Sequence, residues 1–461
     1  MSPLFSYRCI PFVCSGVSLA STLFSAQVYM KVGYEISVLG KGLWDERSRA
    51  GIHRVVENQY AVLANRADLN VEPVCMDPRQ LVASEAYVEG HEALYDESVR
   101  SILTEEDAAM VRVHSRLKRD ASRLKRSLAE AFSLQKYLER KCLKSRLRAS
   151  PMPQCILDLS QLERLDVYHS PHLPLQSEVL NQKRLAPFFT AHDFIILKHP
   201  EFFKGSNQEA LSQYLAKLSG REWVCCVSES TRADLLEINP HVDSSRVFVT
   251  PLAAADHFYP CDDRQKLIHA RERYGLPEGS YFLSLCTIEP RKNILGVLRA
   301  FVALASSGEC PDVSLVLVGG LGWDYAQILD EIEGAKALKE RIIMTGFVPD
   351  TELATIYSNA LAFVYMSFYE GFGLPPLEAM QCGVPVVTSN NSSLPEVVGD
   401  AGCMLDANAN DELCQVMIEL YKNDSLRARH SEKSLARAAQ FSWERSVQQT
   451  VDAYKFATES I

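Results

Sequence analysis

The sequence lacks the patterns of a metal site. It has 13 cysteines, but none form a Cys-x-x-Cys pair, and no Asp-x-Asp motif occurs. Thiols of a zinc or redox site usually come in such pairs. We therefore expect reduced, buried cysteines in a cytosolic protein, with neither a bound metal nor a cofactor.

Excess positive charge is also lacking. The chain carries 48 Lys and Arg against 58 Asp and Glu, a net charge of -10. Proteins whose main partner is nucleic acid usually present a basic surface, so we expect no nucleic-acid partner. With 461 residues, 47% of them hydrophobic, the chain can build two domains with sizeable cores.

Long apolar runs are scarce. One extends over residues 10–30 after Arg8, but it is rich in small and hydroxyl residues, namely Ser15, Gly16, Ser18, Ser21, Thr22 and Ser25. A signal peptide or single anchor is one interpretation. The hydroxyl content favours two others, a poorly ordered extension or a natural start at Met30. We treat residues 1–29 as an N-terminal extension.

The rest of the chain alternates short apolar runs with amphipathic stretches. The first series of runs covers residues 36–39, 71–75, 166–170, 188–191, 224–228 and 246–250, and the second covers 281–286, 314–318, 341–345, 361–365, 385–389 and 402–405. Near-continuous apolar strands between helices indicate parallel sheets covered on both faces. Two series predict an α/β protein with two Rossmann-like, doubly wound domains.

The boundaries follow from composition. We expect an N-terminal domain over residues 30–255 and a linker over 256–280, where prolines and charges show no clear period. A second domain over 281–442 and a C-terminal helix over 443–461 follow. Ser442 is the expected N-cap of that helix.

Residues 85–150 break the alternation and are helical in character. Between positions 111 and 148, 13 Lys and Arg side chains face only three acidic ones, and leucines recur at roughly helical spacing. One interpretation is attraction to an anionic membrane surface or a lipid-phosphate acceptor. The other, slightly favoured, is a solvated helical hairpin that packs on the sheet.

A glycine loop between a strand and a helix carries the main functional pattern. In EGFGLPPLE, Glu370 and Glu378 frame the loop, and the prolines open a helix. Ligands bind at the carboxyl ends of parallel strands, and a helix N-terminus favours a diphosphate there. Glu378 could bond a ribose diol, and Glu370 could face a sugar whose anomeric carbon becomes positive.

A second turn of this kind lies upstream, in EPRKN. Arg291 and Lys292 follow a strand and precede a helix, where cations do not complement the helix dipole. They make sense if they neutralise an anion, because Arg offers a planar fork and Lys a point charge to phosphate oxygens. The alternative is an exposed basic turn.

Together, EPRKN and EGFGLPPLEAM resemble the retaining glycosyltransferases of family four, which have the GT-B fold of two Rossmann-like domains facing across a cleft. The resemblance continues through residues 342–367 and 383–402 and covers nearly all of the C-terminal domain. It implies that Arg291 and Lys292 bind the donor diphosphate. It further places Glu370 by the donor sugar, Glu378 at the ribose, and Val348 by the base.

The resemblance also assigns the loop amides of Phe372, Gly373 and Leu374, beside Gly371, to the sugar and phosphate. The N-terminal domain matches less densely. RAGIHRVVENQ resembles the family's glycine loop, with Gly51 approaching the donor. In FFTAHDFIILKHPEFF, His192 faces the donor sugar, and we expect Asp193 to orient it. His172 in VYHSPH is assigned to the acceptor side, while Ser228 and Thr231 are expected to be turn and cap residues.

This resemblance implies a metal-independent reaction that retains the anomeric configuration, with a nucleotide-diphosphate sugar as co-substrate. The segment from residue 192 to 203 favours GDP-mannose over a UDP-sugar such as glucose or N-acetylglucosamine. The acceptor would be a glycan or a lipid-linked acceptor. The protein itself would be cytoplasmic, with peripheral contact to the inner membrane surface through the basic insertion as an open alternative. A GT-B phosphorylase, an epimerase and a membrane-surface scaffold are the rival functions.

Overall fold

The computed structural model describes residues 29–39, 51–76, 100–101, 134–149, 159–172, 174–203, 208–218 and 220–461, with the single positions Ser84, Val113 and Asp120. Residues 1–28 of the expected extension and most of the basic insertion lie outside these ranges. Arg49, at the start of the expected glycine loop, does so as well.

The first sheet is parallel and has the order β3-β2-β1-β4-β5-β6-β7. Its strands are β1 (Met30–Glu35), β2 (Leu69–Cys75), β3 (Arg100–Ser101), β4 (Val167–Ser170), β5 (Ala186–Ala191), β6 (Trp223–Cys226) and β7 (Val247–Val249). The α-helices of this part are α2 (Ile52–Ala64), α5 (Leu134–Ala149), α6 (Ser177–Leu180), α7 (Ile195–Lys198), α8 (Gln208–Ala216) and α9 (Glu229–Ile238).

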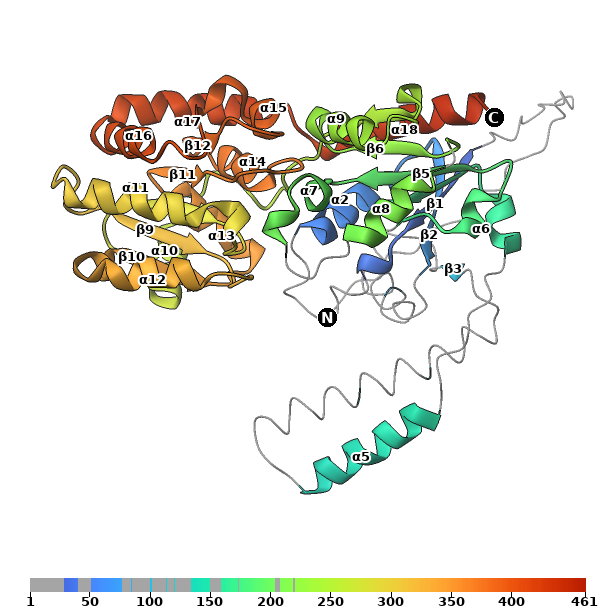
Figure 1. Ribbon diagram of the computed structural model, residues 1–461, viewed down its shortest axis with the longest axis horizontal. Coiled ribbons are helices and arrows are strands. Elements are labelled where there is room, and N and C mark those ends of the chain that lie inside the picture. The colour runs from blue at the N-terminus through green and yellow to red at the C-terminus, as the bar shows by residue number, and fades with distance from the viewer. Residues whose placement is uncertain are drawn as a thin grey trace, which may run out of the picture.

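The second sheet is also parallel, with the order β10-β9-β8-β11-β12-β13. Its strands are β8 (Tyr281–Leu285), β9 (Ser314–Val318), β10 (Ile342–Gly346), β11 (Ala362–Tyr365), β12 (Val386–Ser389) and β13 (Cys403–Leu405). The helices of this part are α10 (Arg264–Tyr274), α11 (Ile294–Ser306), α12 (Ala326–Gly334), α13 (Asp350–Ser358), α14 (Leu374–Gln381), α15 (Leu394–Val398), α16 (Asn410–Lys422) and α17 (Asp424–Ala438), and α18 (Trp443–Glu459) follows them at the end of the chain. The predicted pair of doubly wound α/β units is confirmed (Figure 1).

Two details of the first sheet differ from the prediction. The strand expected at residues 36–39 is wrong, because β1 covers Met30–Glu35 and residues 37–39 form a helical turn. Val32 and Tyr34 are fully buried between β2 and β4. Ile36 and Leu39 are buried as well, so the apolar run after the strand is a buried helical turn. The short strand β3 was missed, since it lies inside the segment expected to be helical.

In each sheet the strand order reverses at one point, between β1 and β4 and between β8 and β11. Loops at the carboxyl ends of such neighbouring strands diverge and leave a crevice, the usual ligand site of open α/β sheets. In the second sheet the two diverging loops are those that contain EPRKN and EGFG. The topology therefore brings together two motifs that are about 80 residues apart in sequence.

The C-terminal helix returns to the first sheet (Figure 1). Ser442 caps α18 as expected, accepting the N–H of Arg445 at 3.2 Å. Val447, Val451 and Tyr454 of this helix are buried in the same core as β1 and α2. The chain thus crosses between the two units twice, and α18 ties its end to the first unit by apolar packing.

Helix α5 is the longest described part of the basic insertion and lies apart from both sheets (Figure 1). Tyr137 and Leu138 are 46% and 55% exposed. The expectation of a hairpin packed on the sheet is wrong for this helix. Its sequence explains why, since charged residues follow one another too closely to leave a wide apolar face.

Candidate active site

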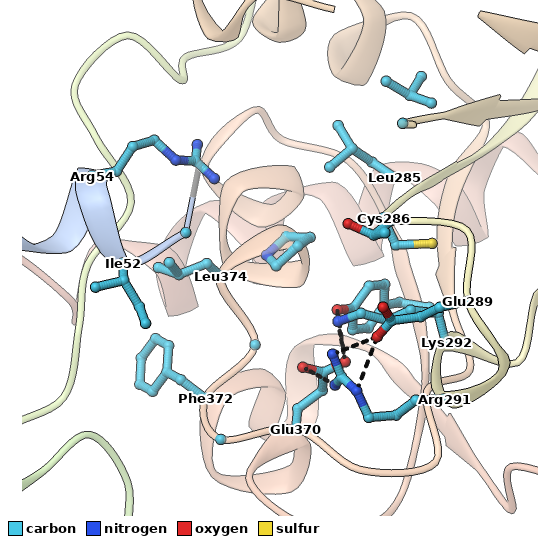
Figure 2. Close-up of a pocket in the computed structure, with 18 of the residues that line it drawn as sticks. Ile52, Arg54, Leu285, Cys286, Glu289, Arg291, Lys292, Glu370, Phe372 and Leu374 are labelled. Carbon is cyan, nitrogen blue, oxygen red and sulfur yellow. Dashed lines mark hydrogen bonds and ion pairs between the residues drawn. The ribbon is translucent and has the colours of Figure 1, made fainter. Parts of the chain in front are cut away.

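A cavity of about 840 Å³ opens between the two sheets. The first unit contributes the start of α2 and the end of β5, and the second contributes the loops that follow β8, β9, β10 and β11. Arg54 lies on one side of this space, and Arg291, Lys292 and Glu370 lie on the other (Figure 2). The cavity is large enough for a nucleotide sugar.

Glu370 is the centre of the charged group in the cavity. Its carboxylate lies 3.0 Å from Nη1 of Arg291 and 2.5 Å from Nζ of Lys292. The hydroxyls of Tyr365 and Ser367 donate to the same oxygen, Oε1, at 2.9 and 2.6 Å. These contacts join the loop after β8 to the loop after β11, so they hold the two motifs together (Figure 2).

The protonation of Glu370 follows from these neighbours. Burial opposes ionisation, but the charges of Arg291 and Lys292 outweigh it and lower the pKa of Glu370 to about 2. Glu289 also pairs with Arg291, at 2.9 Å, although burial raises its own pKa. The carboxyl group of Glu370 is therefore ionised at neutral pH.

These pairs change one part of the sequence argument. Glu370 and Glu289 already pair with the two cations, so the helix-dipole argument alone does not point to a ligand, and the binding of a diphosphate stays a prediction. The turn itself, Pro290–Lys292, is a short 3-10 helix, and α11 begins after it with Asn293 as its N-cap. A phosphate ligand would therefore share Arg291 and Lys292 with Glu370.

The loop after Glu370 is held rigidly by serines. Ser392 accepts the N–H of Glu370 at 3.0 Å, and the hydroxyl of Ser393 lies 3.0 Å from the carbonyl of Glu370 and 2.7 Å from that of Phe372. Gly373, at φ 115°, is the N-cap of α14, and no side chain caps that helix end. Pro375 and Pro376 carry no N–H, and the N–H of Leu377 bonds to the carbonyl of Gly373, so the backbone donors at this helix end are the amides of Leu374 and the loop before it.

Glu378 lies deeper than the other expected site residues. It is 1% exposed and does not line the cavity, but its Oε1 lies 2.8 Å from Nη1 of Arg54. The hydroxyl of Tyr357 donates to its other oxygen at 3.1 Å. Arg54 also lies 3.4 Å from Asp350. A residue of the first unit thus holds the carboxylate expected at the ribose.

The comparisons with known proteins agree with this geometry. Residues 269–437 match the family model of the glycosyl transferases group 1. O-antigen chain mannosyltransferase B of Escherichia coli is 36% identical over 291 residues, which are 63% of this chain and 74% of that protein. The chain belongs to glycosyltransferase family four.

Solved structures of low sequence identity show the fold over most of the chain. A glycosyltransferase of Rickettsia africae aligns with a TM-score of 0.61 at 14% identity, covering 93% of this chain and 98% of that one. HepE of Anabaena, solved in complex with UDP, aligns with a TM-score of 0.60 at 14% identity, covering 92% and 98%. Serotype-specific mannosyltransferase WbdA of Escherichia coli is 29% identical over 57% of this chain, which covers 32% of WbdA.

Most of the residues expected to form the glycosyltransferase site line the cavity between the two sheets. They are Gly51, His192, Asp193, Arg291, Lys292, Val348, Glu370, Gly371, Phe372, Gly373 and Leu374. His172 is exposed and Glu378 is buried, and neither lines it. Gly51, at φ 58°, ends the expected glycine loop just before α2.

The group that orients His192 differs from the prediction. Its Nε2 donates to the carbonyl of Pro171 at 2.7 Å, which leaves Nδ1 as an acceptor. Asp193 instead accepts the N–H of Ile195 at 3.2 Å, so its expected orienting role is wrong. Burial lowers the pKa of His192 despite the carbonyl. The imidazole of this glycosyltransferase is therefore neutral at pH 7.

Sequence reasoning missed Tyr365, Ser367 and Arg54. Tyr365 was counted as the last residue of a buried strand, and Ser367, two residues after that strand, was given no role. Arg54 lies in a helix with both polar and apolar residues, where a charged side chain suggests a solvated face. No His, Cys, Asp and Glu cluster suited to a metal ion occurs among the described residues. In the same part of the chain, no helix is long and apolar enough to span a membrane.

Proposed function

We propose that this glycosyltransferase moves a hexose from a nucleotide-diphosphate sugar to a glycan or lipid-linked acceptor in polysaccharide synthesis. The favoured donor is GDP-mannose. The observation that carries the proposal is the ionised Glu370, held by Arg291 and Lys292 at the switch point of the second sheet. The likeness to an O-antigen mannosyltransferase supports mannose as the sugar.

The donor would lie along the carboxyl ends of the second sheet. Its diphosphate would bind Arg291, Lys292 and the uncapped end of α14, where the amides of Phe372–Leu374 begin the helix. The base would lie by Val348, at the end of β10, and the ribose toward Glu378. This order follows the cavity from the loop after β11 to the loop after β10.

We propose a reaction that retains the anomeric configuration. The bond between the sugar and the diphosphate breaks while the acceptor hydroxyl forms a bond to the anomeric carbon on the same face, and its proton passes to the departing phosphate oxygen. Arg291 and Lys292 stabilise the negative charge of the leaving group, in place of a metal. The carboxylate of Glu370 stabilises positive charge on the sugar, and the neutral His192 can accept a hydroxyl hydrogen through Nδ1.

A screen of nucleotide sugars by thermal denaturation tests the donor. A ligand that binds only the folded protein raises its stability by about 2.7 kcal/mol at a hundred times its dissociation constant. We expect GDP-mannose to raise the melting temperature more than UDP-glucose, UDP-N-acetylglucosamine or GDP. A larger shift with a UDP-sugar would contradict mannose, and no shift with any of them would contradict the donor site.

A transfer assay with the selected donor tests the reaction. We expect a product whose anomeric configuration, measured by NMR coupling constants, equals that of the donor, and turnover that survives EDTA. Inversion, or loss of turnover with EDTA that Mg²⁺ restores, would contradict the proposed mechanism. Phosphate-dependent sugar release without transfer would indicate a phosphorylase, and conversion of the donor sugar without an acceptor would indicate an epimerase.

We further propose a cytoplasmic protein whose helix α5 contacts the inner surface of an anionic membrane and so reaches a lipid-linked acceptor. Lys136, Arg140 and Lys144 repeat every fourth residue and form one stripe of α5. Each basic residue near an anionic surface contributes about 1 kcal/mol.

Vesicle binding tests this contact. Replacing all three stripe residues with Gln should weaken binding to vesicles with anionic lipid about 100-fold, and neither protein should bind zwitterionic vesicles. The control removes three exposed lysines of the second unit, Lys339, Lys422 and Lys433. Equal loss in both variants would contradict a specific role of α5.

A further inference from the structure

Two hydroxyls of the first unit bind the backbone of the donor loop in the second. Ser228 caps α9 by accepting the N–H of Thr231 at 3.0 Å. That bond uses only the oxygen of the serine. Its proton faces two acceptors, the carbonyl of Gly371 at 2.6 Å and the hydroxyl of Thr231 at 3.0 Å, and the carbonyl is the nearer of the two. Thr231 adds its own hydroxyl, 3.1 Å from the same carbonyl. The expected cap is confirmed, but a cap requires neither of these two donors.

The hydroxyl of Thr231 also lies 3.4 Å from the carbonyl oxygen of His192. Its single proton is thus placed between two carbonyls, one in each unit. Ser228 and Thr231 are each 1% exposed, so water does not compete for these contacts. The hydroxyl pair therefore links the backbone of the residue after Glu370 to the backbone of His192.

The two backbones touch. A Cβ atom on Gly371 would lie 2.0 Å from the carbonyl oxygen of His192 and 2.8 Å from Cβ of Asp193. The hydroxyls of Ser228 and Thr231 lie at this contact and donate to the carbonyl of Gly371 at 2.6 and 3.1 Å. The absence of a side chain at position 371 and the hydroxyls on α9 thus serve the same contact.

Further contacts join α9 and the second unit at the same place. The carboxylate of Glu396 accepts the N–H groups of Glu229 and Ser230, each at 2.8 Å. The hydroxyl of Tyr369 donates to Asp234 of α9 at 2.8 Å. The first turns of α9 are therefore fitted against the residues on both sides of Glu370.

We propose that Ser228 and Thr231 are positioning residues that set Glu370 against His192 across the cleft. They contact neither the sugar nor the diphosphate, and act through the carbonyls of Gly371 and His192. The inference rests on the proposed function of the cleft. It adds that the distance between Glu370 and His192 that allows sugar transfer is set by the hydroxyls of α9, and not by the bound donor alone.

The test uses Thr231→Val, which keeps the shape of the side chain and removes only the hydroxyl. We expect kcat for transfer to fall about tenfold, the effect of about one hydrogen bond lost from the transition state. KM for the donor and the affinity for the nucleoside diphosphate should stay within about twofold, because the groups that bind them belong to the second unit. Thr231→Ser should restore most of the rate.

The matched control is Thr450→Val. Thr450 is also buried, and its hydroxyl donates to the carbonyl of Ser446 within α18, away from the cleft. Thr450→Val should lose about as much stability as Thr231→Val, but its kcat should not change. Equal kcat for Thr231→Val and the wild type, or equal loss in the Thr450 control, would overturn the inference. Failure of the wild type to transfer any sugar would instead overturn the proposed function.

Hydrogen exchange gives a readout that needs no substrate. The amides of Phe372 to Leu374 should exchange faster in Thr231→Val than in the wild type, while the amides of α16 should not change. Unchanged exchange in the donor loop would overturn the inference even if the function of the cleft proved different.

Discussion

Replacing Lys292 with alanine should remove most transfer activity and leave the protein folded. The ammonium group lies 2.5 Å from Glu370 and 2.7 Å from the hydroxyl of Tyr365, so it holds the carboxylate and also faces the cavity. Loss of one preorganised charged donor to a developing anion typically slows a reaction about 10²- to 10³-fold, or about 3 to 4 kcal/mol. We expect kcat of Lys292→Ala to fall by that factor.

The structural cost of this change is smaller. Without Lys292, Glu370 still contacts Arg291 at 3.0 Å and accepts from Ser367 at 2.6 Å, so a buried charge is not left alone. The loss of one charge-assisted hydrogen bond destabilises the fold by about 1 to 3 kcal/mol, against about 3 to 5 kcal/mol for a buried ion whose partner is removed. Urea denaturation should therefore give a two-state transition with a modestly lower midpoint.

Steady-state transfer of labelled sugar, measured beside denaturation, is the assay. Lys339→Ala is the control, because Lys339 pairs with Glu333 on the exposed surface, where such a pair is worth about 0 to 1 kcal/mol. Near-normal turnover of a folded Lys292→Ala protein would refute the role given to Lys292. Loss of the fold itself would refute the account of how Glu370 is held.

Three further outcomes are expected. Arg54→Met should lower the free energy of unfolding by about 3 to 5 kcal/mol, since it leaves the buried Glu378 without its cation, and denaturant titration measures this. Burial opposes the ionised form of Glu370, but the neighbouring cations favour it more strongly, and its pKa falls from 4.5 to about 2. The ionised carboxylate therefore contributes about 3 kcal/mol to the free energy of unfolding above pH 4.5, and this contribution is lost as the pH falls toward 2. The difference in stability between the wild type and Glu370→Gln should disappear over that range. Gly371→Ala should abolish transfer and lower the melting temperature, because the new methyl would meet the carbonyl oxygen of His192.

Each of these outcomes has a control and a contrary result. Arg299→Met breaks a half-exposed pair with Glu331 and should cost far less than Arg54→Met; equal costs would contradict a buried role for Arg54. A stability gap that does not narrow between pH 5 and pH 3 would contradict the ionised state of Glu370. Gly334 has open space beside it, so Gly334→Ala should be tolerated, and active Gly371→Ala protein would contradict the close contact.

The second sheet could be predicted almost strand for strand. Its inner strands are buried on both faces and are nearly continuous apolar runs, as at Leu315 and Val316 of β9, while the edge strands β10 and β13 are partly buried. The site motifs could be placed too, because both follow strands that meet at a switch point. The position of β1 could not, since a buried helical turn at residues 36–39 is as apolar as a strand.

Contacts between the two units were beyond the sequence. Arg54 and Glu378 are more than 300 residues apart, and nothing local distinguishes Arg54 from a solvated helix residue. The hydrogen bond from Ser228 to Gly371 could not be predicted either. The sequence identifies Ser228 as a helix cap, in which its oxygen accepts an N–H, but its bond to Gly371 depends on how the two units pack. Such contacts depend on how the two units pack against each other.

A crystal structure with the nucleoside diphosphate of the selected donor tests the central claim most directly. The account predicts diphosphate oxygens within hydrogen-bond distance of Arg291 and Lys292, at the start of α14, with the base by Val348. A diphosphate bound elsewhere in the cavity, with Arg291 and Lys292 contacting only Glu370 and Glu289, would contradict it.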